Sequence, residues 1–334
     1  MTGKRRLWGR RVAGLLSMAL CVCLSLAFLN EFCVDKGHYR DLKRIMYEDP
    51  ENSYPLIFAG GSHISGAINP NHFKKIYGVS SFNSSTGGQE FYETYYLLKE
   101  ILKRQDPEVV VLDAYYAMNQ SPYGDPSFTH RVLDPMRMGP NKLEAIRVSV
   151  EENVGSYLFP FLLYHSRWEN FPQLISEWAD YVGPYKGALG FTGGPNQYGK
   201  ELQYDNWDDT HCTPLAEKQE EYLQKFFALA REEGFKLILI NFPCELESDE
   251  LTEWAGDAVG KMNQIKKEAA AAGVPMLDLN RPEMIAAMDF DFPTMMSNAS
   301  HVNYYGAYNV TEYVGKYLQQ VTPELFENAE PAAS

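Results

Sequence analysis

The chain is predicted to fold as an α/β protein: a three-layer sandwich with about five parallel strands between two layers of helices. Residues 108–112 (EVVVL) and 236–241 (KLILIN) are uninterrupted apolar runs, as in parallel strands buried on both faces. Segments with apolar residues at helical spacing alternate with these runs, which indicates a sheet covered by helices. A further apolar run, 56–59 (LIFA), ends at Gly60 and Gly61 and predicts a strand followed by a tight turn.

The other elements are predicted from the same patterns. Strands are expected at 79–82 and 274–278, and helices at 70–77, 89–104, 214–233, 249–272 and from Asn303 to about Gln320. Residues 35–54 are polar and predict a stalk or a first helix, and the tail 323–334 is predicted to be frayed. These elements place one domain at 35–322.

The region of about 115–210 lacks strand–helix alternation and is predicted to be an insertion or cap in that domain. It is rich in aromatic residues, which suit a sugar-binding cleft, although packing is the favoured interpretation for most of them. The residues concerned are Tyr115, Tyr116, Tyr123, Trp168, Trp178 and Trp207.

Residues 1–34 are predicted to target the chain to a membrane. Five of the 30 Lys and Arg residues lie within the first eleven positions, and an uncharged apolar stretch, 12–29, follows them. At 1.5 Å per residue this stretch is about 27 Å long, which is enough to span a bilayer. The basic end stays in the cytoplasm, so the body of the protein is expected outside, at the cell membrane. An uncleaved anchor is favoured, and the alternative is a secreted protein cleaved after Ala27.

The charge of the body argues against a nucleic-acid partner. Outside the first eleven residues the chain has 25 basic residues and all 44 of its acidic residues. Phosphate binding requires a basic face, so no nucleic acid is expected. No cofactor and no metal are expected either: Asp208, Asp209 and His211 lack a further histidine at ligand spacing. Cys212 and Cys244 are the two cysteines of the body, and the sequence alone does not decide whether they form a disulfide.

A serine and a histidine far apart in the sequence are the candidate catalytic pair. Ser62 follows the turn after the first predicted strand, and His301 precedes the last predicted helix. Open α/β sheets keep their active sites at the carboxyl ends of strands, so Ser62 is the expected nucleophile and His301 its base. The alternatives are a serine and a histidine that only cap helices. Asn298 could orient the imidazole, although an aspartate would also stabilise the imidazolium; Asp289 or Asp291 could replace it if the loop folds back.

Donors for an oxyanion are expected near the nucleophile. The candidates are the backbone amides of Ser62 and His63, the side chain of Asn83 and the turn at Gly87 and Gly88. Asp113, at the end of the strand predicted over 108–112, is a further candidate. An ordinary strand-to-helix loop is the alternative for residues 83–89, because such loops also favour Asn, Ser and Gly.

These motifs together resemble the SGNH/GDSL hydrolase superfamily, which has a flavodoxin-like fold. Within it they are similar to the membrane-anchored branch that includes the alginate O-acetylation proteins and the D-alanyl-transfer protein of teichoic acid synthesis. The matching pieces are Gly60-Gly61-Ser62-His63, Phe82-Asn83 with Gly88-Gln89, residues 109–113 (VVVLD), residues 301–307 (HVNYYGA) and residues 164–168 (YHSRW). The likeness covers roughly 55–115 and 214–320, and within the inserted region only 164–168.

The resemblance implies an extracytoplasmic serine acyltransferase or esterase that acts on a cell-surface polysaccharide through an acyl-enzyme on Ser62. A membrane-bound O-acyltransferase is the partner it implies. Two positions depart from the family pattern. Asn298 stands where an aspartate is expected, and Asp113 or Tyr115 stands at the asparagine of the third motif. A non-catalytic binding or scaffold protein of the same fold is therefore the alternative function, and a plain esterase without a partner is a further one.

The resemblance also suggests residues that contact a substrate. His165 and Arg167 could bind a carboxylate or sugar hydroxyls, and His63 and Asn303 are further candidates. The alternative for Arg167 is a structural ion pair with an aspartate, with Trp168 in the core of the cap.

Overall fold

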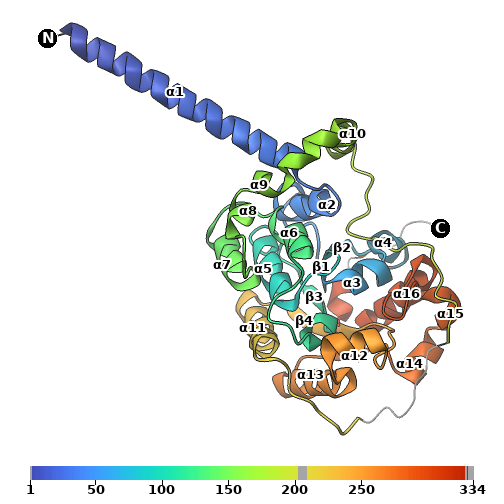
Figure 1. The fold of residues 1–334 in the computed structure, drawn as a ribbon. Coiled ribbons are helices and arrows are strands. Elements are labelled where there is room, and N and C mark those ends of the chain that lie inside the picture. Colours follow the sequence, from blue (N-terminus) through green and yellow to red (C-terminus); the bar gives the residue numbers. More distant parts are fainter. Residues whose placement is uncertain (1, 202–208, 328, 330–334) are drawn as a thin grey trace. The chain divides into compact units, whose positions relative to one another are not determined.

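Five parallel strands form one sheet, so the predicted fold class is confirmed (Figure 1). The computed structural model describes residues 2–201, 209–327 and 329. The strands lie in the order β2-β1-β3-β4-β5, the flavodoxin-like order of a doubly wound sheet. They are β1 (Leu56–Gly60), β2 (Ser81–Ser85), β3 (Val109–Asp113), β4 (Lys236–Asn241) and β5 (Met276–Asp278).

The order of the strands reverses at β1. From β1 the chain moves outward to β2, and it then returns to β3 on the other side of β1. Loops after β1 and β3 therefore leave in opposite directions, and ligands of open α/β sheets bind in the crevice between them. Ser62 follows β1 and Tyr115 follows β3, so both lie at this edge.

Alternate residues of the strands pack against the two helical layers. Phe58, Val111 and Ile240 lie in one hydrophobic core with residues of α4 (Pro70–Tyr77) and α16 (Tyr304–Val321). The opposite face is covered by α5 (Phe91–Ile101), α11 (Glu217–Glu233) and α13 (Ala258–Ala272). This three-layer arrangement explains the uninterrupted apolar runs in β1, β3 and β4.

Short helices complete the unit that contains the sheet, residues 38–151 and 186–334. They are α2 (Tyr39–Lys43), the π-helical turn η1 (Arg44–Glu48), α3 (Ser62–Ala67), η2 (Tyr115–Met118), α6 (Pro126–Leu133), α7 (Pro140–Ser149), α12 (Asp249–Ala255), α14 (Pro282–Ala287), α15 (Phe292–Met295) and η4 (Pro323–Phe326). Leu42, Ile45 and Met46 of the expected stalk are fully buried, so this segment is part of the unit rather than a free linker. Leu325 is also buried, and the tail is therefore ordered as far as η4, contrary to the prediction.

Two predicted elements differ from the structure. The second strand runs over Ser81–Ser85 instead of 79–82, which places Asn83 inside the strand, opposite Phe58. The helix predicted over 249–272 is two helices, α12 and α13. Gly256 ends α12 with a φ of 70°, and Asp257 begins α13 by accepting a hydrogen bond from the Gly260 amide at 2.9 Å.

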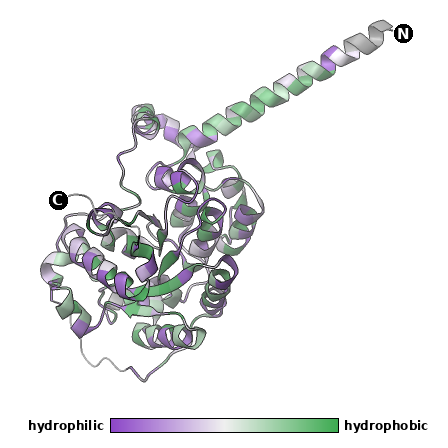
Figure 2. Cartoon of the chain, turned by 180° about the vertical axis from the view of Figure 1, so that it is seen from behind, coloured by the Kyte–Doolittle hydropathy of each residue, from purple (hydrophilic) through white to green (hydrophobic). Residues whose placement is uncertain are grey.

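A second compact unit consists of residues 1–37 and 152–185. Its helices are α1 (Thr2–Cys33), α8 (Val154–Leu158), α9 (Phe161–Tyr164), the 3₁₀ turn η3 (His165–Asn170) and α10 (Phe171–Val182). Within α1, the 26 residues Trp8–Cys33 are long and apolar enough to cross a membrane, with a mean hydropathy of 2.5 (Figure 2). An anchor and a signal sequence both fit this finding.

The region predicted as an insertion divides between the two units. Residues 126–149 form α6 and α7, which pack on α5, whereas 152–185 belong to the unit of α1. Residues 186–199 return to the sheet unit without regular structure. Trp207 and Asp208 lie outside the described residues.

Two carboxyl groups are buried at the start of α5. Glu90 is 4% exposed and Glu93 is fully buried, and the Glu90 amide donates to Glu93 Oε2 at 3.0 Å. Burial, followed by the charge of Glu93, raises the pKa of Glu90 to about 8. Burial raises the pKa of Glu93 to about 7. Both carboxyls hold protons in the folded protein at a pH where an unfolded chain has released them.

We expect the free energy of unfolding to fall as the pH rises from about 5 to about 8, because the folded state binds more protons than the unfolded state over this range. Each carboxyl contributes up to ~1.4 kcal/mol per pH unit. Urea unfolding at a series of pH values measures this slope. Glu90→Gln should flatten it and Glu232→Gln, at an exposed position on α11, should not; equal slopes in the wild type and Glu90→Gln would contradict the assignment.

Candidate active site

The structure brings the predicted nucleophile and base together. The Ser62 hydroxyl lies 2.7 Å from His301 Nε2, although the two residues are 239 positions apart. Ser62 is partly exposed and begins α3 at the carboxyl end of β1. The predicted proximity is therefore confirmed, and the geometry allows proton transfer from the hydroxyl to the imidazole.

The two glycines before Ser62 are required by close packing. A Cβ on Gly60, whose φ is 156°, would lie 2.5 Å from Asp113 Cβ. A Cβ on Gly61 would lie 2.3 Å from the Tyr116 ring. Asp113 ends β3 and Tyr116 lies in η2, so the loop after the neighbouring strand presses directly on the turn that presents Ser62.

A short closed loop presents His301. An antiparallel bridge joins Met296 to Val302, and the Ser297 amide donates to the His301 carbonyl at 2.8 Å. Asn298 Oδ1 accepts from the His301 amide at 2.9 Å and lies 3.1 Å from His301 Nδ1. The Ser300 hydroxyl lies 2.9 Å from the same nitrogen. A proton on Nδ1 that is donated to Asn298 leaves Nε2 free to accept from Ser62.

The partners of the His301 imidazole are neutral. Burial lowers the pKa of His301 from 6.5, so the ring is uncharged at neutral pH. The two aspartates considered as substitutes for Asn298 are placed elsewhere. Asp291 caps α15 by accepting from the Thr294 amide at 3.2 Å, and Asp289 is exposed. The carboxylate of a Ser–His–Asp triad is therefore replaced by the Asn298 amide.

His63, predicted as a possible substrate ligand, is buried behind the catalytic pair. Its ring stacks on His301 with the centroids 4.4 Å apart, and its Nδ1 lies 3.8 Å from Asp113 Oδ2. Neither His63 nitrogen has a hydrogen-bond partner among the described residues. Burial, followed by the proximity of His301, holds the pKa of His63 well below its usual value. This placement makes His63 a neutral packing neighbour of the base rather than a surface for substrate.

Asp113 holds the turn and does not provide an oxyanion donor. Its Oδ1 accepts from the Tyr115 amide at 3.0 Å, and the carboxyl also accepts from the Gly61 amide. Burial raises its pKa to about 7. By accepting hydrogen bonds from backbone amides, Asp113 stabilises the turns after β1 and β3, and it is therefore a positioning residue.

Tyr116 was expected only as one of the aromatic residues of the cap, and its place beside Ser62 was not predicted. Its phenol is close enough to Ser62 for a hydrogen bond between the side chains. Burial, together with the charge of Glu90, raises its pKa far above the usual value, so the phenol keeps its proton and can donate. Its position three residues after the end of β3 was the available signal, because loops after neighbouring parallel strands meet at one edge of the sheet.

Of the candidate donors in residues 83–89, only the two glycines lie near the turn that presents Ser62. Asn83 is fully buried within β2 and its Nδ2 donates to the Ile68 carbonyl at 2.8 Å, which removes it from the candidate oxyanion donors. Gly87 and Gly88 follow β2 next to the turn, since Ser85 pairs with Gly60. A Cβ on Gly88, whose φ is 67°, would lie 2.0 Å from the Phe128 ring.

Arg131 also lies at this motif. Its Nη1 is 3.0 Å from the position of a Cβ on Gly87. Its guanidinium carbon lies 4.8 Å from the centroid of the Phe128 ring. Both side chains come from α6 and are missed by sequence reasoning, because only tertiary packing brings this helix to the glycines.

Asn303 and Arg167 already have protein partners. Asn303 is fully buried and caps α16, with Oδ1 accepting from the Tyr305 and Gly306 amides and Nδ2 donating to the Thr294 carbonyl at 2.7 Å. Arg167 donates to both carboxylate oxygens of Glu177 at 2.7 Å and to the Cys33 carbonyl at 2.8 Å. Arg167 thus forms a structural ion pair, but with a glutamate instead of the expected aspartate, and Trp168 is 65% exposed rather than in a core. His165 is exposed, and both residues belong to the unit of α1 rather than to that of Ser62.

The segment 186–199 links the two halves of the site. The Thr192 amide donates to the Ser65 carbonyl at 2.8 Å, next to the nucleophile in α3. The Tyr304 amide donates to the Gly194 carbonyl at 2.8 Å, and Asn303 Nδ2 donates to the Asn196 carbonyl at 2.9 Å. The same chain segment therefore binds the helix of Ser62 and the start of the helix after His301.

The possible metal and disulfide residues have other environments. His211 Nε2 lies 2.6 Å from Asp257 Oδ2, and Asp209 pairs with Arg281. Within residues 2–201, 209–327 and 329, no group of three His, Cys, Asp or Glu side chains is placed to hold a metal ion. Cys212 and Cys244 are both free thiols.

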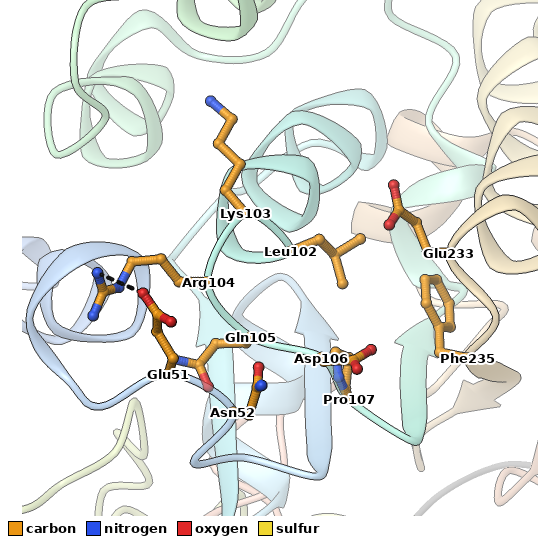
Figure 3. Close-up of a pocket in the computed structure, with 10 residues that line it drawn as sticks. All are labelled: Glu51, Asn52, Leu102, Lys103, Arg104, Gln105, Asp106, Pro107, Glu233 and Phe235. Carbon is orange, nitrogen blue, oxygen red and sulfur yellow. Dashed lines mark ion pairs between the residues drawn. The ribbon is translucent and has the colours of Figure 1, made fainter.

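A cavity of about 300 Å³ lies at the opposite edge of the sheet (Figure 3). Asn52, Pro107 and Phe235 line it just before β1, β3 and β4, and Arg104 pairs with Glu51 at its rim. Because Ser62 and His301 lie at the carboxyl ends of the strands, this cavity is not their substrate pocket.

No protein-family model matches the chain. No curated protein matches it. Among solved structures, a protein of Bacteroides fragilis assigned as an acylhydrolase is similar with a TM-score of 0.40 and 12% identity, over 81% of this chain and 88% of that one. The acetyl xylan esterase AlAXEase is similar with a TM-score of 0.39 and 13% identity, over 80% and 98% of the two chains. Likenesses this distant carry no argument about activity, which depends on the site itself.

Proposed function

We propose that this protein is a membrane-anchored serine acyltransferase or esterase that acts outside the cytoplasm on an ester of a cell-surface polysaccharide. The observation that supports it best is the 2.7 Å contact between the Ser62 hydroxyl and His301 Nε2 at the carboxyl edge of a parallel sheet. A serine paired with a neutral imidazole, at the edge where such sheets bind ligands, is suited to nucleophilic attack on an acyl group.

The proposed reaction has two steps. His301 Nε2 takes the proton of Ser62 as the oxygen attacks the acyl carbonyl, and the imidazolium then protonates the leaving group. An acyl-enzyme on Ser62 results. In the second step His301 takes a proton from a sugar hydroxyl or from water, which attacks the acyl-enzyme and releases Ser62 with its proton restored. Transfer and hydrolysis share the first step, so product analysis with and without a glycan acceptor separates them.

The proposed oxyanion site uses three donors near Ser62. The phenol of Tyr116 supplies a side-chain donor beside the nucleophile. Backbone amides of Ser62 and Gly88 supply the others, since the turn after β1 lies beside the turn after β2. Donors fixed by packing stabilise a developing negative charge without reorganising. Tyr116 would thus take the role of the asparagine that the third family motif lacks here.

Two features support the proposed location and substrate class. Basic residues precede the apolar part of α1, and this charge asymmetry supports an orientation with the remaining chain outside the cytoplasm. Tyr304 and Tyr305, shortly after His301, are 38% and 49% exposed, and exposed aromatic rings provide apolar faces for sugars. The polysaccharide and a partner O-acyltransferase in the membrane come from the family resemblance.

Asn298 favours one alternative, a non-catalytic scaffold of the same fold. An imidazolium on His301 lacks a carboxylate partner at Nδ1, where Asn298 and Ser300 are the contacts. Loss of the carboxylate weakens a catalytic triad strongly. The two functions differ in the reactivity of Ser62, which covalent labelling measures.

The full-length protein in detergent should react with a fluorophosphonate probe at Ser62. Ser62→Ala should abolish labelling because it removes the nucleophile, and His301→Ala should reduce it at least ~100-fold because it removes the base. Ser176→Ala, at an exposed position on α10, is the matched control and should label as the wild type does. If folded wild-type protein resists the probe, the scaffold function is supported instead.

Tyr116→Phe should lower kcat for p-nitrophenyl acetate by roughly 10²-fold with little change in KM, because it removes a donor that acts on the transition state. Tyr95→Phe is the control, since this tyrosine of α5 packs its ring on Tyr222 and Phe226 of α11. An unchanged kcat in Tyr116→Phe would exclude the phenol from the oxyanion site.

Asn298→Asp should shift the acid limb of kcat/KM to higher pH. Burial keeps the pKa of wild-type His301 below 6.5, so activity is lost only below that pH. A carboxylate at Nδ1 favours the imidazolium, which raises the pKa of the base and increases the rate on the plateau by about tenfold or more. The pH profiles of the wild type and of Asn298→Ala provide the comparison. Coincident limbs in Asn298→Asp and wild type would show that residue 298 does not control the base.

A further inference from the structure

The segment 152–185 exposes more large apolar side chains than the described part of the sheet unit does. In this short segment eight large apolar side chains are between 43% and 65% exposed. The described part of the sheet unit, which is several times longer, exposes Met138, Leu143, Tyr304 and Tyr305. The eight residues are Val154, Phe159, Leu162, Leu163, Trp168, Phe171, Ile175 and Val182. Such a concentration of exposed apolar surface marks an interaction site.

Helix α10 has one apolar stripe, and most of that stripe faces outward. The apolar residues Phe171, Leu174, Ile175, Trp178 and Val182 follow a spacing of three or four. Leu174 is 2% exposed, whereas Phe171, Ile175 and Val182 are 55%, 46% and 62% exposed. A helix of a soluble domain would bury this stripe against its core, so α10 has an unmatched apolar face.

Contacts within the same unit place α10 beside the end of the apolar helix α1. The Trp178 ring lies 5.9 Å from Phe28 and 5.5 Å from Phe32, and Phe171 lies 6.3 Å from Phe32. The Tyr181 hydroxyl donates to Glu31 Oε1 at 2.5 Å. The uncharged stretch of α1 ends at residue 29, so α10 lies at the level where the chain would leave the bilayer.

The chemistry of this level fits the membrane interface. Trp and Tyr rings favour the boundary between acyl chains and headgroups. Trp178 and Tyr181 lie at the level where α1 ends, and Lys36 Nζ lies 5.5 Å from the Trp178 ring centroid and 4.7 Å from that of Tyr181. Helix α10 contains Glu177 and Asp180 but no Lys or Arg. Attraction to anionic lipids therefore has no source in α10, and apolar burial is the available driving force.

We infer that α10 is an interfacial helix whose exposed face, Phe171, Ile175 and Val182, inserts among the acyl chains of the outer leaflet. This rests on the proposed anchoring of the protein by α1. The lipid is favoured as the occupant because the apolar face of α10 is continuous with the apolar surface of α1 through Phe28 and Phe32. The helix would hold its unit against the bilayer at a second point besides the anchor.

The test uses the full chain in phosphatidylcholine vesicles that contain a lipid with a diazirine on its acyl chain. Illumination followed by peptide mass spectrometry identifies residues that touch acyl chains. We expect adducts in the apolar part of α1 and on the face of α10 with Phe171, Ile175 and Val182, and none at Gln173 or Glu177. Adducts in α1 alone would overturn the inference. This is also the result expected if α10 binds another membrane protein instead of lipid. A chain without adducts in α1 would contradict the anchoring itself.

Charge substitutions sharpen the result. Ile175→Glu should reduce adducts on the remaining α10 residues several-fold because a carboxylate disfavours insertion. Ser176→Glu adds the same charge one position away, outside the apolar stripe, and should leave the adducts unchanged. Adducts in α1 serve as the internal standard for both variants. Equal α10 labelling in the two variants would also overturn the inference.

Discussion

The close approach of the β3 loop to the turn after β1 is the constraint on which the site depends. Gly60 and Gly61 have no side chains because Asp113 and Tyr116 occupy that space. The carboxyl of Asp113 binds the amides of Gly61 and Tyr115, so the two turns are held as one structure. The direction of the Ser62 side chain follows from this packing, and so does the presence of a phenol beside it.

The second half of the site reaches Ser62 through the packing of α16. This helix contacts α3 and α4, which follow the nucleophile, and a Cβ on Gly315 would lie 2.0 Å from the Tyr77 ring of α4. The Asn69 amide donates to Thr311 Oγ1 at 3.0 Å and joins the same elements. Together with the segment 186–199, these contacts hold the loop of His301 over the start of α3.

The electrostatics of the site are those of a neutral base. The two stacked rings of His63 and His301 both have lowered pKa values because they are buried. Asn298 can orient the His301 ring, but as a neutral amide it gives the imidazolium less stabilisation than a carboxylate would. The structure therefore supports the geometry of nucleophilic catalysis with a weaker charge balance than a Ser–His–Asp triad.

The sequence by itself determined the α/β class, the approximate positions of the five strands and the meeting of Ser62 with His301. Local patterns suffice for the class and for most strands, because an apolar run marks a strand buried on both faces. The meeting of Ser62 with His301 was an expectation from their places near the two ends of the predicted sheet domain. The tertiary structure alone decided the register of β2, which buries Asn83, and the capping role of Asn303. It also decided that Tyr116 and Arg131 lie at the site. Such roles depend on which backbone groups and side chains from distant parts of the chain surround a residue. The spacing of residues along the sequence does not determine that packing.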